Sequence, residues 1–132
     1  MMLHGRKIYP GRVIGLALVT HMGISFFGGI DPENGIVVEK GHALQGQSIA
    51  GKILVFPTGK GSTVGSYTLY RLKSAGLAPL AIINSECETI TAVGCIIAEI
   101  PCIDQVPIER LETGMELLVD GEEGSVTLPD PL

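Results

Sequence analysis

Tryptophan is absent from this chain, which also has only three phenylalanines, three tyrosines and three cysteines. The cysteines, Cys87, Cys95 and Cys102, form no CxxC pair, and an odd number without a secretory signal argues against a disulfide framework. Their spacing matches no common ligand pattern for an iron–sulfur cluster. Two of them lie inside apolar runs, where cysteine behaves as a small hydrophobic residue, so we expect the three thiols to be structural.

Long apolar helices and basic runs are lacking as well. The longest stretch without a charged residue, 13–30, includes polar residues and glycines and is too poor in leucine and isoleucine for membrane insertion. Two strands joined near residues 21–23 explain it better. No basic run exceeds Arg6-Lys7 and the net charge is −5, which argues against nucleic acid as a partner. Residues 1–10 have no signal-peptide core, so the sequence predicts a cytoplasmic protein without a membrane segment.

What is abundant is glycine, with 18 residues, in a chain that is 45% hydrophobic. This composition suits closely packed β and α layers in one domain over residues 1–132. Hydrophobic patterning and turn signals predict helices at 63–75 and 89–98, and strands at 14–20, 24–27, 36–38, 53–56, 80–83, 101–103, 117–119 and 125–128. The last two form a hairpin, the terminus around His4 is expected to fray, and 40–50 forms a polar loop. The fold class is α/β, in a β/β/α layered arrangement.

Several polar residues are expected to be structural or solvated. None of the three histidines, His4, His21 and His42, has a second ligand at metal-binding spacing, and His42 is expected to be a solvated or capping loop residue. Asp31 is expected to hold its own turn. The acidic pairs Glu86/Glu88 and 122–123 are expected to be solvated. In helix 89–98, periodicity aligns Ile90, Val93 and Ile97 on one face.

The most informative stretch is 53–76. An apolar run ends at Pro57, glycines at 59, 61 and 65 surround Ser62 and Thr63, and a helical pattern follows that ends near Gly76. Glycines allow a tight turn and close approach of a ligand, and free N–H groups at a helix start stabilise anions. Ser62 is therefore a candidate for chemistry. The alternative is that it only caps the helix.

Two nucleotide-binding motifs fit this loop poorly. A phosphate-binding loop needs serine or threonine directly after its lysine, but Gly61 follows Lys60. The dinucleotide fingerprint needs a third glycine where Val64 stands. Nucleotide binding is therefore not favoured.

The pattern resembles the swivelling domain of the aconitase superfamily, with Gly61-Ser62-Thr63 in place of a Gly-Ser-Ser turn. The closer resemblance is to the small subunit of the aconitase X group of split dehydratases. It covers nearly the whole chain and rests on the order of segments FGGIDP (27–32), GKIL (51–54), PTGKGS (57–62), APLAII (78–83) and GCIIAEIP (94–101). One departure is Val64, where aconitase has an arginine that binds a substrate carboxylate.

This resemblance implies a division of labour between two chains. Ser62 would be the catalytic base, Lys60, Gly61 and Thr63 would contact the substrate, and a separate large subunit would carry an iron–sulfur cluster. This chain would bind no metal. The reaction would be the dehydration of a small anionic hydroxy acid, first (R)-5-phosphomevalonate to trans-anhydromevalonate 5-phosphate in the mevalonate pathway of isoprenoid biosynthesis, and second a hydroxyproline.

Other classes of function stay open at this point. A phosphocarrier-like swivelling domain would need a histidine at a loop-to-helix junction, whereas the two junctions hold Ser62 and Thr89. A non-catalytic assembly subunit would use Ser62 only as a cap.

Overall fold

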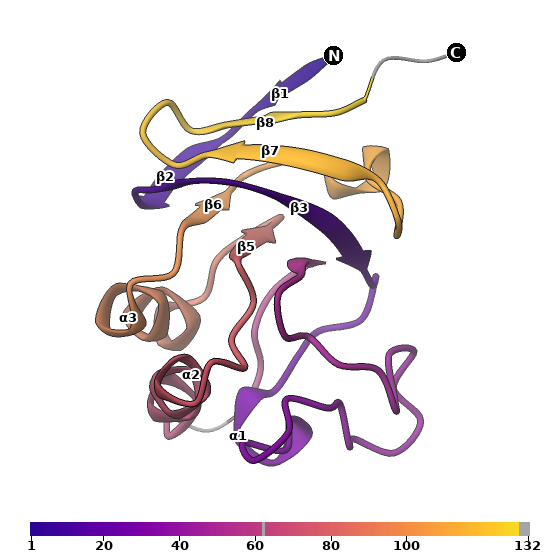
Figure 1. The fold of residues 1–132 in the computed structure, drawn as a ribbon, viewed down its shortest axis with the longest axis vertical. Helices are drawn as coiled ribbons and strands as arrows, with labels where there is room; N and C mark the ends of the chain where they lie inside the picture. Colours follow the sequence, from indigo (N-terminus) through magenta and orange to yellow (C-terminus); the bar gives the residue numbers. More distant parts are fainter. Residues whose placement is uncertain (62, 130–132) are drawn as a thin grey trace.

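The computed structural model describes residues 1–61 and 63–129, which form an eight-stranded sheet with helices on one side. The strands follow the order β1-β8-β7-β3-β4-β5-β6-β2 (Figure 1). Strands β3 to β6 are parallel, and the outer pairs are antiparallel. The elements are β1 (Met2–His4), β2 (Arg6–Tyr9), β3 (Arg12–Val19), α1 (Phe26–Gly29), β4 (Ile53–Phe56), α2 (Gly65–Ser74), β5 (Ala81–Asn84), α3 (Thr89–Ala98), β6 (Cys102–Asp104), a 3₁₀ turn at Ile108–Arg110, β7 (Glu116–Asp120) and β8 (Ser125–Thr127).

Two hydrophobic clusters define the layers. In Figure 1, β5 and β6 lie between α2 and α3 on one side and β7 and β8 on the other. Strand β4 supplies both clusters, because successive side chains of a strand point to opposite faces. Leu54 and Phe56 pack toward the helices, and Ile53 and Val55 pack toward β7 and β8. All four residues are fully buried, which confirms the prediction of a β/β/α arrangement built on a strand buried on both faces.

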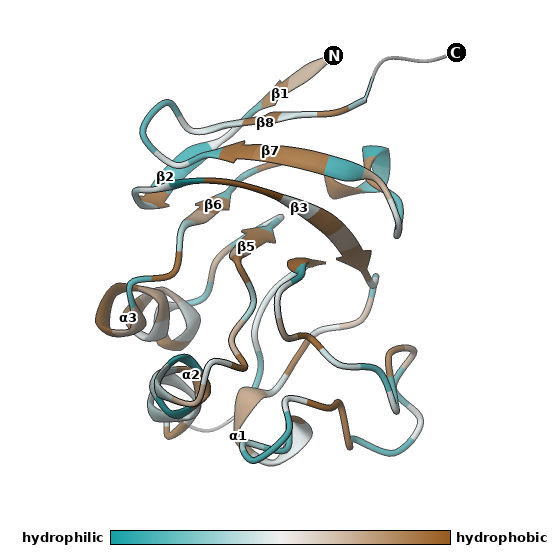
Figure 2. Ribbon diagram, in the orientation of Figure 1, coloured by the Kyte–Doolittle hydropathy of each residue, from teal (hydrophilic) through white to brown (hydrophobic). Residues whose placement is uncertain are grey.

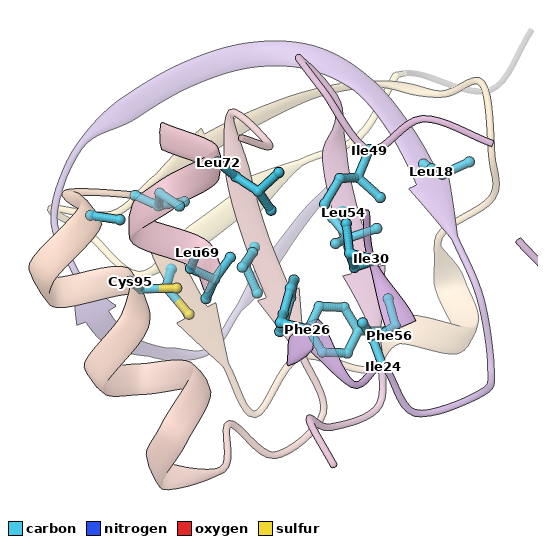
Figure 3. Packing of buried hydrophobic residues seen from close by; sticks show 14 of the residues in the cluster. Leu18, Ile24, Phe26, Ile30, Ile49, Leu54, Phe56, Leu69, Leu72 and Cys95 are labelled. Carbon is cyan, nitrogen blue, oxygen red and sulfur yellow. The ribbon is translucent and has the colours of Figure 1, made fainter. Parts of the chain in front are cut away.

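The cluster below the sheet positions the loop that follows β4. Figure 3 shows Leu69, Leu72 and Cys95 of the two helices in one cluster with Leu54 and Phe56 of β4. Phe26 meets Phe56 edge to face, with ring centroids 5.8 Å apart. Since Phe56 is the last residue of β4, this packing fixes the point at which the glycine-rich loop leaves the sheet.

The N-terminal residues are ordered strands, so the prediction of a frayed terminus was wrong. Strand β1 pairs with β8, and β2 pairs with β6 at the opposite edge. Arg6 donates two hydrogen bonds to the buried carboxylate of Asp104, at 2.9 and 2.7 Å. In Figure 2, β2 is teal over part of its length, whereas β3 and β7 are mostly brown. Strands β1 and β2 form the two edges of the sheet, and only Gly5 separates them in the chain. The sheet therefore curls and brings its two edges close together.

Two of the predicted strands were also wrong. Residues 24–27 contain a single bridge from Ile24 to Gly59, followed by the short turn α1, in which Gly28 has a φ of 86°. Residues 36–38 form only isolated bridges, from Ile36 to Ser48 and from Val37 to Ile30. Neither segment has a continuous neighbouring strand. Ile24, Phe26 and Val37 enter the cluster below the sheet, whereas Phe27 and Val38 are exposed.

Helix α3 has the predicted bounds but a different buried face. Its buried residues are Thr91, Gly94, Cys95 and Ala98. Small side chains allow α3 to approach α2 closely, because a Cβ atom on Gly94 would lie 2.5 Å from Leu69. The face aligned by periodicity is partly exposed, with Val93 at 41% and Ile97 at 46%. Among the described residues, no helix is long and apolar enough to cross a membrane.

Candidate functional site

The loop that follows β4 is held against residues 24 and 25. The backbone of Ile24 donates to the carbonyl of Thr58 at 3.3 Å and accepts from the N–H of Lys60 at 2.9 Å. Gly61 has a φ of 102°, and a Cβ atom there would lie 2.5 Å from the hydroxyl of Ser25. Glycine is therefore required at 61 both for the backbone conformation and for this close approach.

The same loop contacts the beginning of α3. The carboxylate of Glu88 caps that helix, accepting hydrogen bonds from the N–H groups of Ile90 at 3.0 Å and Thr91 at 2.8 Å and from the Thr91 hydroxyl at 3.0 Å. A Cβ atom on Gly59 would overlap Oγ1 of Thr91 and lie 2.8 Å from Oε1 of Glu88. Glu88 is thus a structural cap that touches the loop, and the prediction that it is solvated was wrong.

The predicted site residues differ in what the structure describes. Ser62 lies outside the described residues. Its neighbours Gly61 and Thr63 are both exposed. Lys60 forms an ion pair with Glu39, Nζ to Oε2 at 3.0 Å, while its side chain stays 48% exposed. The ammonium group of Lys60 is therefore accessible at the loop.

A pocket of about 350 Å³ lies between α1 and the first two turns of α2, and Val64, which follows the loop, lines it. Phe27, Val64 and Tyr67 form much of its apolar lining, and Asp31 and Arg71 are its charged residues. Asp31 accepts a hydrogen bond from the N–H of Glu33 at 2.9 Å, which confirms its predicted role in the turn. Sequence reasoning missed Arg71, although its position seven residues after Val64 places both on one face of a helix.

His42 is buried, so the solvated alternative of its prediction was wrong, whereas a hydrogen bond within its own loop confirms the capping alternative. Its Nδ1 accepts a hydrogen bond from the N–H of Leu44 at 3.0 Å, which assigns the proton to Nε2. Nε2 then donates to the carbonyl of Gly23, also at 3.0 Å. His42 therefore ties the loop around residue 42 to the turn before Ile24, on the side of the candidate site.

The cysteines form no metal site among the described residues, where no group of three potential ligands gathers. The Sγ atoms of Cys87 and Cys102 lie 3.9 Å apart, and all three cysteines are free thiols. Contact with the Cys102 thiol, together with burial, raises the pKa of Cys87 well above its usual range. A protonated, half-buried thiol is a poor metal ligand and a poor nucleophile.

We therefore expect the folded chain to resist alkylation of its cysteines. At pH 8, iodoacetamide should modify Cys87 far more slowly than it modifies the same residue in urea, because the thiolate is the reactive form. Mass spectrometry of time points in buffer and in urea measures the two rates. Equal rates in both would contradict the raised pKa.

This chain is similar to a known protein family, to named relatives and to a solved structure. Residues 2–128 match the model of the aconitase X swivel domain. A phosphomevalonate dehydratase small subunit from Thermococcus kodakarensis is 53% identical over 128 residues, covering 97% of this chain and 96% of the relative. A protein of the same name from Methanosarcina acetivorans is also 53% identical, covering 98% and 92%. The crystal structure of Thermococcus kodakaraensis aconitase X (holo-form) aligns over 98% of this chain and 99% of the other, with a TM-score of 0.97 and 52% identity.

Proposed function

Because this chain belongs to the aconitase X swivel-domain family, we propose that it is the small subunit of a heteromeric hydro-lyase that dehydrates (R)-5-phosphomevalonate to trans-anhydromevalonate 5-phosphate. One observation carries the proposal. About half of the residues are identical, over nearly the whole chain, to those of relatives named phosphomevalonate dehydratase small subunit. The glycine-rich loop and its neighbouring pocket give this chain a surface on which a small substrate can be held.

The chemistry assigned to this chain is proton removal. The reaction takes one proton from C2 of the substrate and hydroxide from C3, and it forms a carbon–carbon double bond and one water molecule. We assign the proton acceptor to Ser62, with Lys60, Gly61 and Thr63 contacting the substrate. A serine acts as a base only when its alkoxide is stabilised, and backbone N–H groups and a nearby ammonium supply that stabilisation. We assign the role of this ammonium to Lys60.

An iron–sulfur cluster, which the family implies, does not fit the described residues of this chain. Such clusters are held by several cysteine thiolates. Here Cys95 and Cys102 are buried within the core, and the pKa of Cys87 is raised. We therefore assign the cluster to the large subunit.

The alternative functions are less well supported. The relatives reported above are named for phosphomevalonate, not for a hydroxyproline. A phosphocarrier needs an accessible histidine at a junction between loop and helix, yet both ring nitrogens of His42 are hydrogen-bonded. The assembly-subunit alternative is separated from the enzyme by substitution of Ser62, as argued in the Discussion.

The proposal predicts that activity requires two chains. Co-expressed with a hydratase-like large subunit, this chain should form a 1:1 complex by light scattering, and the anaerobically prepared complex should convert phosphomevalonate to its anhydro product. The isolated chain, reconstituted with iron and sulfide, should bind no stoichiometric iron and show no turnover. Stoichiometric iron on the isolated chain, or failure of the two chains to associate, would contradict this division of labour.

A further inference from the structure

Arg71 is a cation without an acidic partner beside the candidate site. It lies on α2, is exposed, and lines the pocket next to the glycine-rich loop. Within 1–61 and 63–129, no carboxylate lies within ion-pair distance of its guanidinium group. By contrast, Arg6 and Lys60 are paired with Asp104 and Glu39 at 2.7 and 3.0 Å. The structure therefore leaves the donors of Arg71 available to a bound anion.

The pocket suits a short carbon segment of a small molecule that ends in an anionic group. Its lining includes Phe27, Ile30 and Val64, with Tyr67 between Val64 and Arg71 on the helix. Its other charged residue, Asp31, accepts the N–H of Glu33 within its own turn. A guanidinium presents several N–H donors in a planar fork that matches the oxygens of a phosphate.

The helical register sets the distance between this cation and the loop. Val64 precedes α2 directly, and Arg71 follows it by seven residues, which is two turns or roughly 10 Å along the axis. Both residues line the same pocket. An anion held by Arg71 therefore lies at the far end of the pocket from the loop. Phosphomevalonate has its phosphate at one end, separated by a short carbon chain from the reacting carbons, which lie beside its carboxylate.

We propose that Arg71 binds the phosphate group of the substrate and so determines specificity for phosphomevalonate over mevalonate. This inference rests on the proposed function. It assigns a phosphate subsite to this chain, at a position well removed from Val64, where the aconitase-type arginine is missing.

The test compares two substrates in the complex with the large subunit. Arg71→Gln should lower kcat/KM for phosphomevalonate on the order of 10- to 100-fold, the scale of lost hydrogen bonds to a charged group. The value for mevalonate, which lacks the phosphate, should stay within about twofold of the wild type. Competitive inhibition by inorganic phosphate should weaken by a similar factor, and Arg71→Lys should fall between wild type and Arg71→Gln.

Lys73→Gln is the matched control, since it removes the same charge from the same helix. Lys73 donates to the carbonyl of Glu99 and does not line the pocket, so its variant should keep the wild-type preference.

Three results for Arg71→Gln would overturn the assignment: an equal loss for both substrates, an unchanged preference for phosphomevalonate, or weaker subunit association with unchanged kcat/KM at saturating large subunit. The last would identify Arg71 as a contact to an acidic side chain of the partner. If the wild-type complex does not dehydrate phosphomevalonate, the proposed function itself is wrong. The wild-type activity therefore separates that failure from a failure of the Arg71 assignment.

Discussion

Replacing Ser62 with alanine is expected to reduce kcat of the reconstituted complex on the order of a hundredfold or more. A positioned base contributes at least this much to proton abstraction. The chain should still fold, because loss of a helix cap typically costs only about 1 kcal/mol. The substitution also leaves both hydrophobic clusters unchanged. Stopped-flow or discontinuous turnover assays with phosphomevalonate measure kcat, and thermal unfolding measures stability.

The informative comparison is with the neighbouring hydroxyl. Thr63→Ala removes an exposed side chain from the same loop and should be milder, since Thr63 is expected to position the substrate and not to take its proton. The two variants are compared at matched melting temperature, so that a difference in kcat reports on chemistry. Near-normal turnover of Ser62→Ala would identify the serine as a cap and place the base on the large subunit.

Elements whose signals are local could be predicted from the sequence. Strand β4 is an unbroken apolar run, α3 has the predicted bounds, and the β7–β8 hairpin surrounds a glycine-rich turn. The N-terminal strands could not be predicted, because their partners lie at the other end of the chain: Met2 pairs with Thr127, and Arg6 with Asp104. A short polar strand such as β2 has no periodicity of its own. Its stability comes from the ladder and from the Arg6–Asp104 ion pair.

The site shows the same division between local and long-range information. The glycine pattern of residues 59–65 identified the loop, because glycine spacing is visible in one segment. The contact between Gly59 and Glu88 depends on β4 and β5 being parallel neighbours, whose carboxyl ends lie together at one edge of the sheet. The loops that follow them therefore meet. The sequence around Glu88 favours a solvated acid, because nothing in its own segment indicates this contact.

The contact that requires a glycine at position 59 is therefore different from the one that the sequence suggests. A glycine in such a loop is usually explained by close approach of a ligand. Here the space is taken by the protein itself, since the hydroxyl of Thr91 and the carboxylate of Glu88 occupy the position of a Cβ atom. These groups are fixed by three hydrogen bonds at the start of α3, so they cannot move aside freely.

Gly59→Ala is therefore expected to displace the loop and to lower kcat by up to about a hundredfold, the effect of misplacing a catalytic group by roughly 1 Å. The cost in stability should be smaller, about 1 to 3 kcal/mol, as for other overpacked sites. Gly65→Ala is the control, because a Cβ atom there meets Ile90 at an ordinary 3.6 Å. That variant should keep wild-type kcat and be as stable as the wild type or more so, since alanine favours a helix.

A second substitution tests the cause. Thr91→Ala removes the hydroxyl that the new Cβ atom would strike, so the double variant Gly59→Ala/Thr91→Ala should recover much of the turnover lost by Gly59→Ala. The appropriate reference is Thr91→Ala alone, which lacks the hydrogen bond from the threonine to Glu88 but leaves the loop in place. If Gly59→Ala retains full kcat, or if Thr91→Ala gives no recovery, the packing of the loop against α3 does not position the catalytic residues. Recovery would instead establish that the first turn of α3, through Glu88 and Thr91, holds the glycine-rich loop in its active geometry.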